Sequence, residues 1–176
     1  SIIPRALGRM RPDALPDRVR ISVLSAEDVE AAVLSRQADI GFSNPPLDHP
    51  GLDVLGLYSA PCVMAVARTH PLAGRTRVSI REMQDETLVT MGTQFRFRRL
   101  VMEALASHQV STGREVICSS MITALQVVRE GLGAAIVEPL TAFQGPSRDV
   151  AIIPLEEEVR FYWGAIASTG TSMDAD

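Results

Sequence analysis

The chain contains no lysine, because all 17 of its basic residues are arginine. This absence excludes two chemistries that depend on a lysine amine: Schiff-base catalysis and nucleotide binding by a P-loop. The sequence also lacks the G-x-S-x-G, H-E-x-x-H, C-x-x-C and G-x-G-x-x-G patterns of hydrolases, zinc sites, redox pairs and dinucleotide binding. We therefore expect no catalytic residues, no metal and no cofactor, and we predict that the protein is not an enzyme.

Cysteine and histidine are scarce as well. The two cysteines, Cys62 and Cys118, each lie in an apolar run, which favours buried free thiols in a reducing, cytoplasmic setting. His49, His70 and His108 are far apart and fall in turns or at the end of a predicted helix. We expect them to be surface or turn residues rather than metal ligands or catalysts.

Long hydrophobic runs are absent, so no segment is expected to span a membrane. Hydrophobic residues make up 46% of the 176 residues and the net charge is -4, a composition typical of a soluble domain or two small lobes. The acidic balance argues against direct nucleic-acid binding, which needs a basic face. The first residues show no signal-peptide pattern. They begin within a helical pattern, so we expect a leading segment before Ser1.

Strand and helix patterns alternate along the chain, which predicts an α/β fold with mostly parallel sheets flanked by helices. Helical spacing covers residues 2–11, 26–37, 79–83, 93–108 and 121–130, and strand patterns cover residues 19–23, 38–43, 52–58, 62–67, 87–91, 115–118, 134–137, 150–154 and 159–166.

Residues 89–99 form the stretch on which a functional prediction depends most. An apolar strand pattern ends at Met91-Gly92, and a helical pattern opens at about Thr93. The free N–H groups and the dipole of such a helix start attract small anions, carboxylates above all. The alternative is that Thr93 only caps the helix and that the arginines beside it are solvated.

Small polar residues also follow other predicted strands. In parallel sheets, ligands bind beyond the carboxyl ends of the strands, so these positions together predict a binding site. Each of them has helix capping as its alternative role. The positions are Ser25, Ser43-Asn44, Thr93-Gln94 and Ser119-Ser120.

Four segments resemble the effector-binding domain of LysR-type transcriptional regulators. They are VLSAEDVEAAVLSRQADIGFSNPP, PGLDVLGLYSAPCVMAVARTHPLAG, VSIREMQDETLVTMGT and SSMITALQVVREGLGAAIVEP, in this order. The resemblance covers nearly the whole chain. GLGAAIVEPLTA and TQFRFRR are closest to the branch that senses amino acids and opines.

The resemblance implies two Rossmann-like lobes joined by two crossover strands, as in type II periplasmic binding proteins. Lobe I would comprise residues 1–90 plus 159–176, and lobe II residues 91–158, with crossovers near residues 89–91 and 155–159. The effector, a small carboxylate or amino-acid-like molecule, would bind between the lobes. The residues that correspond to the family's effector contacts are Thr93, Gln94, Phe95, Ser43, Glu138 and, more weakly, Ser25.

Two departures from the family pattern concern the ends of the chain. The family's first strand, with its Ser/Thr-rich loop, would precede Ser1, and no C-terminal helix is recognisable, so we expect residues 169–176 to form a tail. The winged helix-turn-helix DNA-binding domain is absent from this chain, so any contact with DNA would go through that missing domain. The family implies a cytoplasmic homodimer or homotetramer.

Three other functions remain possible from the sequence. A transport receptor with the same fold would need a signal peptide or lipid anchor and a monomeric state. An enzyme on this fold would need a nucleophile or an acid–base pair in the cleft, and none is recognisable. A plain interaction domain would bind no small molecule.

Overall fold

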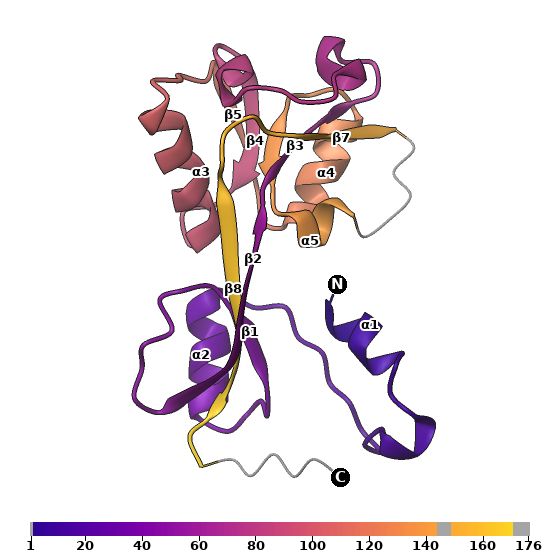
Figure 1. Cartoon of the computed structure of the whole chain (residues 1–176), viewed down its shortest axis with the longest axis vertical. Helices are drawn as coiled ribbons and strands as arrows, with labels where there is room; N and C mark the ends of the chain where they lie inside the picture. Colours follow the sequence, from indigo (N-terminus) through magenta and orange to yellow (C-terminus); the bar gives the residue numbers. More distant parts are fainter. Residues whose placement is uncertain (1, 144–148, 171–176) are drawn as a thin grey trace.

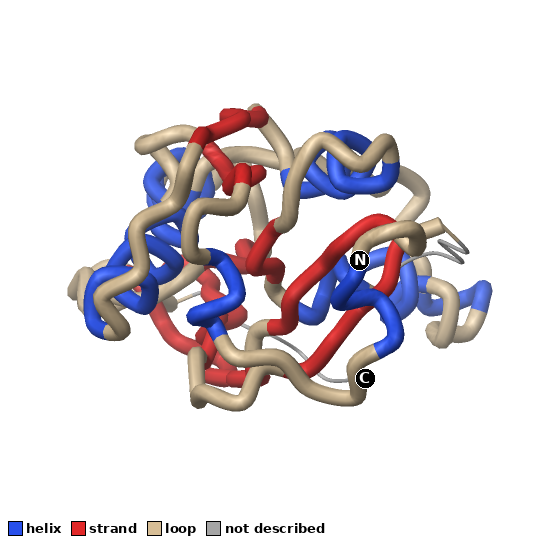
Figure 2. The backbone as a smooth tube through the Cα atoms, turned by 90° about the horizontal axis from the view of Figure 1, so that it is seen from above, coloured by secondary structure: helices blue, strands red, loops and turns tan. Residues whose placement is uncertain are grey.

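The computed structural model describes residues 2–143 and 149–170 of the chain. These residues form two lobes, one above the other in Figure 1, with two long strands running between them. Seen from above, helices flank the strands on both sides (Figure 2). Within the described residues, none of the helices combines the length and the apolar character needed to cross a membrane.

The two long strands are β2 (Leu52–Pro61) and β8 (Arg160–Ser168). They pair antiparallel along their length, from Leu52 opposite Ser168 to Pro61 opposite Arg160, and together they form the connection between the lobes (Figure 1). β8 also pairs antiparallel with β1 (Gly41–Ser43), which gives the order β1-β8-β2. Helix α2 (Ala26–Leu34) packs on this sheet and completes the lower lobe.

The upper lobe contains the remaining strands. β3 pairs antiparallel with β6 and β7, and β4 pairs parallel with β5. A parallel bridge between Leu88 and Ala134 joins β4 to β6, so the strand order across the lobe is β5-β4-β6-β3-β7. The strands are β3 (Val63–Ala67), β4 (Thr87–Met91), β5 (Arg114–Cys118), β6 (Ala135–Val137) and β7 (Val150–Pro154).

Helices pack against this upper sheet and make it the main core of the protein. All five residues of β3 are buried, because β3 is flanked by β6 and β7 and packed against by α4, α5 and η2. A smaller core in the lower lobe joins Val33 of α2 to Leu52 and Ile166. The upper helices are α3 (Arg96–Ser107), α4 (Met121–Arg129), α5 (Pro139–Ala142) and the 3-10 turns η2 (Pro71–Gly74) and η3 (Ile80–Met83).

The prediction of mostly parallel sheets is wrong for the described residues. The α/β class is correct, but parallel pairing is limited to β4 with β5 and to isolated bridges, whereas β1, β2, β3, β6, β7 and β8 pair antiparallel. The long strands explain the difference. β2 and β8 cross between the lobes in opposite directions, and β3 continues β2 into the upper lobe. Alternation of helices and strands in sequence does not reveal such crossings.

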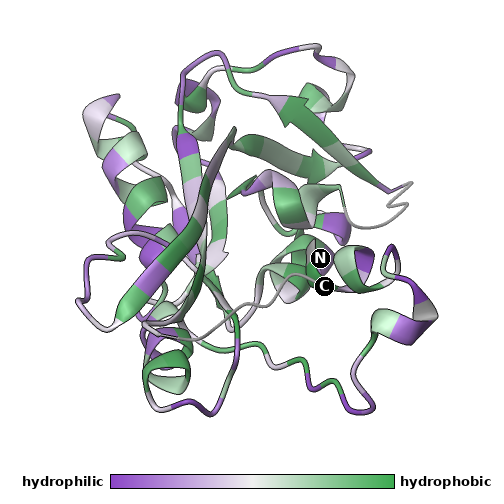
Figure 3. Cartoon of the chain, turned by 60° about the horizontal axis from the view of Figure 1, so that its bottom comes forward, coloured by the Kyte–Doolittle hydropathy of each residue, from purple (hydrophilic) through white to green (hydrophobic). Residues whose placement is uncertain are grey.

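The N-terminal segment differs most from its prediction. Helix α1 (Ile2–Leu7) is shorter than expected, and a 3-10 turn η1 (Pro12–Ala14) follows it. The predicted strand over residues 19–23 has no regular secondary structure and pairs with no described strand, and its apolar residues are exposed. Figure 3 shows the alternating hydropathy along this segment between η1 and α2. The segment has the alternating pattern of a strand, but no described strand lies beside it to form the backbone hydrogen bonds.

The predicted lobe boundary at residue 90 does not match the pairing of the strands. β3 bonds to β6 and β7, and β4 lies within the upper lobe, so the first crossing of the chain is the β2–β3 junction near Cys62. β4 is therefore not a crossover. The second crossing, along β8, begins near the predicted 155–159 segment. Part of lobe II (144–148) and the predicted tail beyond residue 170 lie outside the described residues.

Two regions outside the predicted helices and strands also have defined structure. Glu157, in the acidic run of residues 156–158, accepts hydrogen bonds from Ser79 Oγ (2.5 Å) and from the Ile80 N–H (2.8 Å), and so holds the start of η3. Helix α5 follows β6 directly, where the sequence predicted only the end of a strand.

Candidate functional site

The carboxyl ends of β4, β5 and β6 lie on one edge of the upper lobe. These strands run parallel, through the β4–β5 pairing and the Leu88–Ala134 bridge, and their ends face the lower lobe (Figure 1). The polar residues that follow them therefore share this edge: Thr93 after β4, Ser119-Ser120 after β5, and Glu138 after β6. Thr93 and Ser119-Ser120 belong to the predicted set of polar strand ends, whereas Glu138 was expected only from the family resemblance. The local parallel pairing on which their shared edge depends is present.

The turn between β4 and α3 is open to solvent. A hydrogen bond from the Phe95 N–H to the Gly92 carbonyl (3.1 Å) closes it, and α3 begins at Arg96, three residues later than predicted. Phe95 occupies the N-cap position and supplies no side-chain hydrogen bond. The alternative, that Thr93 caps the helix, is therefore wrong. The first turn of α3 keeps backbone N–H groups that no capping side chain satisfies, and Thr93 and Gln94 are exposed beside them.

Three other predicted site residues are engaged within their own lobes. Ser25 caps α2: its Oγ accepts from the Asp28 N–H (3.2 Å) and donates to Asp28 Oδ2 (2.7 Å). Ser120 caps α4 in the same way, accepting from the Thr123 N–H at 3.1 Å. Ser43 is buried, with 4% of its surface exposed. The capping alternative is thus confirmed as a role for Ser25 and Ser120.

Glu138 also bonds to its neighbours along the chain. Its carboxylate accepts from the Thr141 N–H (2.8 Å) and from the Thr141 hydroxyl, so it caps the short helix α5. Burial raises the pKa of Glu138, although the hydrogen bonds from Thr141 act in the opposite direction. Burial, with a smaller contribution from the charge of the Glu138 carboxylate, raises the pKa of the Cys62 thiol to about 12.

Arg96, the first residue of α3, reaches from the upper lobe to the lower one. Its Nε donates to Glu27 Oε1 (2.9 Å) and its Nη1 to Glu30 Oε1 (2.7 Å), both on α2. Nη1 also donates to the backbone carbonyls of Asn44 (2.5 Å) and Pro46 (3.2 Å) in the loop after β1. Burial alone would lower the pKa of Arg96, but hydrogen bonds and charges of Glu30 and Glu27 raise it. One guanidinium thus joins two segments of the lower lobe.

Ser43 bonds to the same carboxylate of Glu30 that Arg96 contacts. Its single hydroxyl hydrogen is shared between Glu30 Oε1 (3.0 Å from Oγ) and the Ala26 carbonyl oxygen (3.3 Å from Oγ). The carboxylate of Glu30 therefore lies between the Ser43 hydroxyl and the Arg96 guanidinium. Ser43 was predicted as an effector contact, and in the structure its hydroxyl orients a carboxylate at the boundary between the lobes.

Sequence reasoning missed Arg96 as a contact between the lobes. One signal could have found it. The first turn of α3 carries no acidic residue and begins with an arginine, where the helix dipole disfavours a positive charge. A cation at that position implies a nearby anionic partner.

The neighbouring arginines, Arg98 and Arg99, pair within the upper lobe. Arg98 Nη2 donates to Glu115 Oε2 on β5 (2.9 Å), and Arg99 Nε lies 3.5 Å from Glu103 Oε1 on α3 itself. Neither pair reaches the lower lobe. The side chains of Arg96, Arg98 and Arg99 therefore end at different partners, because residues this close along a helix point in different directions.

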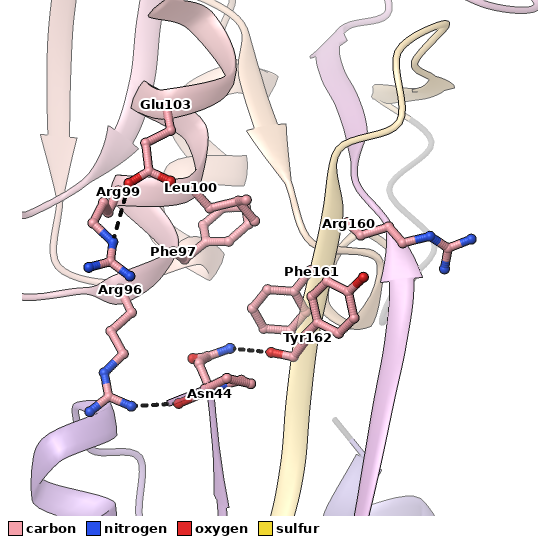
Figure 4. A pocket seen from close by; sticks show the side chains of 10 residues that line it. Asn44, Arg96, Phe97, Arg99, Leu100, Glu103, Arg160, Phe161 and Tyr162 are labelled. Carbon is pink, nitrogen blue, oxygen red and sulfur yellow. Dashed lines mark hydrogen bonds and ion pairs between the residues drawn. The ribbon is translucent and has the colours of Figure 1, made fainter. Parts of the chain in front are cut away.

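A cavity of about 140 Å³ lies beside Arg96, between α3, the Asn44–Pro45 loop and β8 (Figure 4). Asn44 Nδ2 closes it below by donating to the Tyr162 carbonyl (2.8 Å). Phe97 and Phe161 meet edge to face at 5.5 Å and form its apolar back. The volume holds a few water molecules or a small ligand group, and is below the ~300–1,000 Å³ of drug-sized pockets.

The histidines and cysteines bear out their predicted structural roles. His49 Nδ1 accepts from the Gly51 N–H (3.0 Å), His70 Nδ1 accepts from the Leu72 N–H (3.2 Å), and His108 lies at the end of α3. Cys62 and Cys118 are free and buried. Within the described residues, no group of His, Cys, Asp and Glu side chains is arranged to hold a metal ion.

Comparison with known families identifies the chain. The model of the LysR substrate binding domain matches residues 1–176. The chain belongs to the LysR substrate-binding domain family. This LysR domain is 33% identical over 127 residues to the octopine catabolism/uptake operon regulatory protein OccR of Rhizobium meliloti, covering 72% of the chain and 42% of that protein. It is 29% identical over 77 residues to the transcriptional regulator AlsR of Bacillus subtilis, covering 44% of the chain and 26% of that protein.

Solved structures of the same family establish the fold of this LysR domain. The Synechocystis CcmR regulatory domain in complex with 2-PG superposes with a TM-score of 0.81 at 22% identity, covering 96% of the chain and 82% of that structure. The BenM effector-binding domain with benzoate gives 0.79 at 19% identity, with 96% and 78% covered. The fold is thus that of LysR effector-binding domains, which is periplasmic-binding-protein-like, as the sequence predicted. The chain spans about half or less of the length of the curated relatives named above.

Proposed function

We propose that this domain senses a small molecule between its lobes and belongs to a regulator of transcription. The observation that carries the proposal is the exposed turn before α3. There, Thr93 and Gln94 lie beside a helix N-terminus that no side chain caps, on the edge of the upper lobe that faces the lower lobe. Uncapped N–H groups and the positive end of the helix dipole suit a carboxylate.

A carboxylate or amino-acid-like effector fits the charges around this turn. The carboxylate of the ligand would accept from the N–H groups at the start of α3 and from the Thr93 hydroxyl. The other end of the ligand would reach the lower lobe beside Glu27, whose exposed carboxylate also pairs with Arg96. Two relatives support a small acidic ligand by their names alone: CcmR was solved with 2-PG and BenM with benzoate.

Ligand binding would act on transcription through the arrangement of the lobes. A ligand that contacts both lobes favours one arrangement by its differential affinity for it, and such coupling is typically worth about 1–3 kcal/mol. We propose that a DNA-binding domain elsewhere in the complete protein reads this change within a cytoplasmic homodimer or homotetramer. The named relatives are regulators, which favours this function over a transport receptor or an enzyme.

The test is a ligand screen followed by a matched pair of variants. Thermal-shift measurements with amino acids, opines and small carboxylic acids would first identify a ligand. Calorimetric titration of that ligand would then compare wild type with Thr93→Val and with Thr76→Val, an exposed threonine in the loop after η2. We expect Thr93→Val to weaken binding about tenfold, the loss of one hydrogen bond to a charged group. Equal affinity of all three proteins would remove Thr93 from the site.

A further inference from the structure

The contacts of Arg96 lie at the junction of three parts of the molecule. Its backbone is the first residue of α3, directly after the Gly92–Phe95 turn, and its side chain ends on α2 and on the loop after β1. Four hydrogen bonds fix the guanidinium, two to carboxylates and two to backbone carbonyls. A planar guanidinium with several donors is suited to such a multiple contact, which a single ammonium could not reproduce.

Solvent access decides which of these ion pairs matters most. The side chains of Arg96 and Glu30 are only 19% and 18% exposed, whereas that of Glu27 is 58% exposed. Exposed pairs contribute little and are screened by salt, but removal of one partner from a largely desolvated pair leaves an uncompensated charge. The Arg96–Glu30 pair, with Ser43 bonded to the same carboxylate oxygen, is therefore the strong part of the contact.

We propose that Arg96 is a positioning residue that fixes the upper lobe against the lower lobe. Its ion pairs with Glu30 and Glu27 hold the start of α3 over α2 in the arrangement seen here. The connection through β2 and β8 joins the lobes covalently, and the Arg96 contact sets their relative orientation. The orientation of the turn at residues 92–95 toward the lower lobe then depends on a side chain that does not itself need to touch a ligand.

The experiment measures the distance between the lobes in the absence of any ligand. Spin labels attached at Ala31→Cys on α2 and Gln126→Cys on α4, both exposed, report this distance by double electron–electron resonance. The native cysteines are buried and do not compete for the label. We expect Arg96→Met to give a longer and broader distance distribution than the labelled parent protein. Arg96→Lys should restore it in part, because it returns the charge but not the fork of donors.

A matched control distinguishes the loss of the Arg96 contact between the lobes from the mere loss of one positive charge on α3. Arg99→Met removes the same charge from the same helix, but its ion pair with Glu103 stays within α3, so the distance should not change. Glu27→Gln combined with Glu30→Gln removes the carboxylates and retains the carbonyl contacts of Arg96, and it should lengthen the distance. This double variant decides the question if Arg96→Met fails to fold.

An unchanged distance in Arg96→Met, or in the double glutamine variant where Arg96→Met does not fold, would overturn the proposal. No ligand is present in this measurement, so its outcome is independent of whether Thr93 binds an effector. A positive result here together with equal calorimetric affinities for Thr93→Val would leave Arg96 as a positioning residue and refute only the proposed ligand contact.

Discussion

Substitution of Gly133 by alanine provides the sharpest test of how the upper sheet is assembled. Gly133 follows α4 and has a φ of +154°, and an added Cβ would lie 2.3 Å from the backbone carbonyl oxygen of Thr87. That oxygen accepts the Ala134 N–H at 3.0 Å, and Ala134 in turn accepts from the Val89 N–H at 2.8 Å. These hydrogen bonds join β4 to β6. The new methyl group would therefore collide with a backbone atom that connects the β5-β4 pair to the β6-β3-β7 sheet.

Gly131, two residues earlier, is a matched control within the same turn. Its φ is +76°, and no atom lies within 4 Å of an added Cβ. Alanine there meets only the cost of a left-handed conformation, about 1 kcal/mol. At Gly133, conformational strain of roughly 1–3 kcal/mol adds to overpacking of roughly 1–3 kcal/mol, or about 4 kcal/mol in all. A loss of that size is a large part of the stability of a domain, which is typically about 5–15 kcal/mol.

Urea unfolding followed by circular dichroism measures the difference. With a slope of about 2 kcal/mol per molar urea, Gly131→Ala should lower the midpoint by about 0.5 M and Gly133→Ala by about 2 M. Gly74→Ala, at an open position with an ordinary φ, should leave the midpoint unchanged or raise it slightly. Equal midpoints for the Gly131 and Gly133 variants would refute the close packing of residue 133 against Thr87 where β4 and β6 are joined.

Two further predictions concern titrating groups. At pH 8, iodoacetamide should modify Cys62 about a thousandfold more slowly in the folded protein than in urea, since a thiol pKa of about 12 leaves little thiolate; modification at the unfolded rate would contradict its burial. Burial alone would raise the pKa of Glu157, but hydrogen bonds from Ser79 and Ile80 lower it below the ordinary 4.5. Its stabilisation is therefore present above pH 4.5 and is lost as the pH falls through the folded pKa. Glu157→Gln should cost about 1 kcal/mol at pH 7 and progressively less below pH 4.5 in urea titrations; a cost that does not vary with pH would contradict this role.

The elements of the upper lobe were predictable because local signals determined them. The strand predicted over residues 87–91 matches β4 at both ends, and Ser120, for which helix capping was the alternative role, caps α4. Residues 62–67 were predicted as a strand, and all five residues of β3, which lies within that range, are buried. Capping side chains and apolar runs act over a few residues, so the sequence records them directly.

Features that depend on distant partners were not predictable in this way. Residues 19–23 alternate like a strand but find no strand to pair with in the described chain. The length of β2 and β8, and hence the crossing near Cys62, is set by the pairing of segments about a hundred residues apart. A periodic pattern carries no information about either partner.

In the candidate site, too, residues defined by local patterns were predictable, and residues defined by distant contacts were not. The polar strand ends were identified from sequence, and parallel pairing brings two of them, Thr93-Gln94 and Ser119-Ser120, to one edge. The roles of Ser43 and Arg96 were not, because both depend on Glu30, which lies on the face of α2 turned toward them. Only the packed structure shows that the helix start carries a cation whose partners belong to the other lobe.

The most direct test of ligand sensing between the lobes is amide chemical-shift mapping of the 176-residue chain. The acid or amino acid identified by thermal shift would be titrated into the isotopically labelled protein, with Thr76, an exposed residue in the loop after η2, as an internal reference. We predict the largest shifts at the amides of Thr93, Gln94 and Arg96, with smaller shifts in the loop at Asn44. Saturable shifts confined to other surfaces, with the amides of residues 92–97 unchanged, would contradict the proposed site.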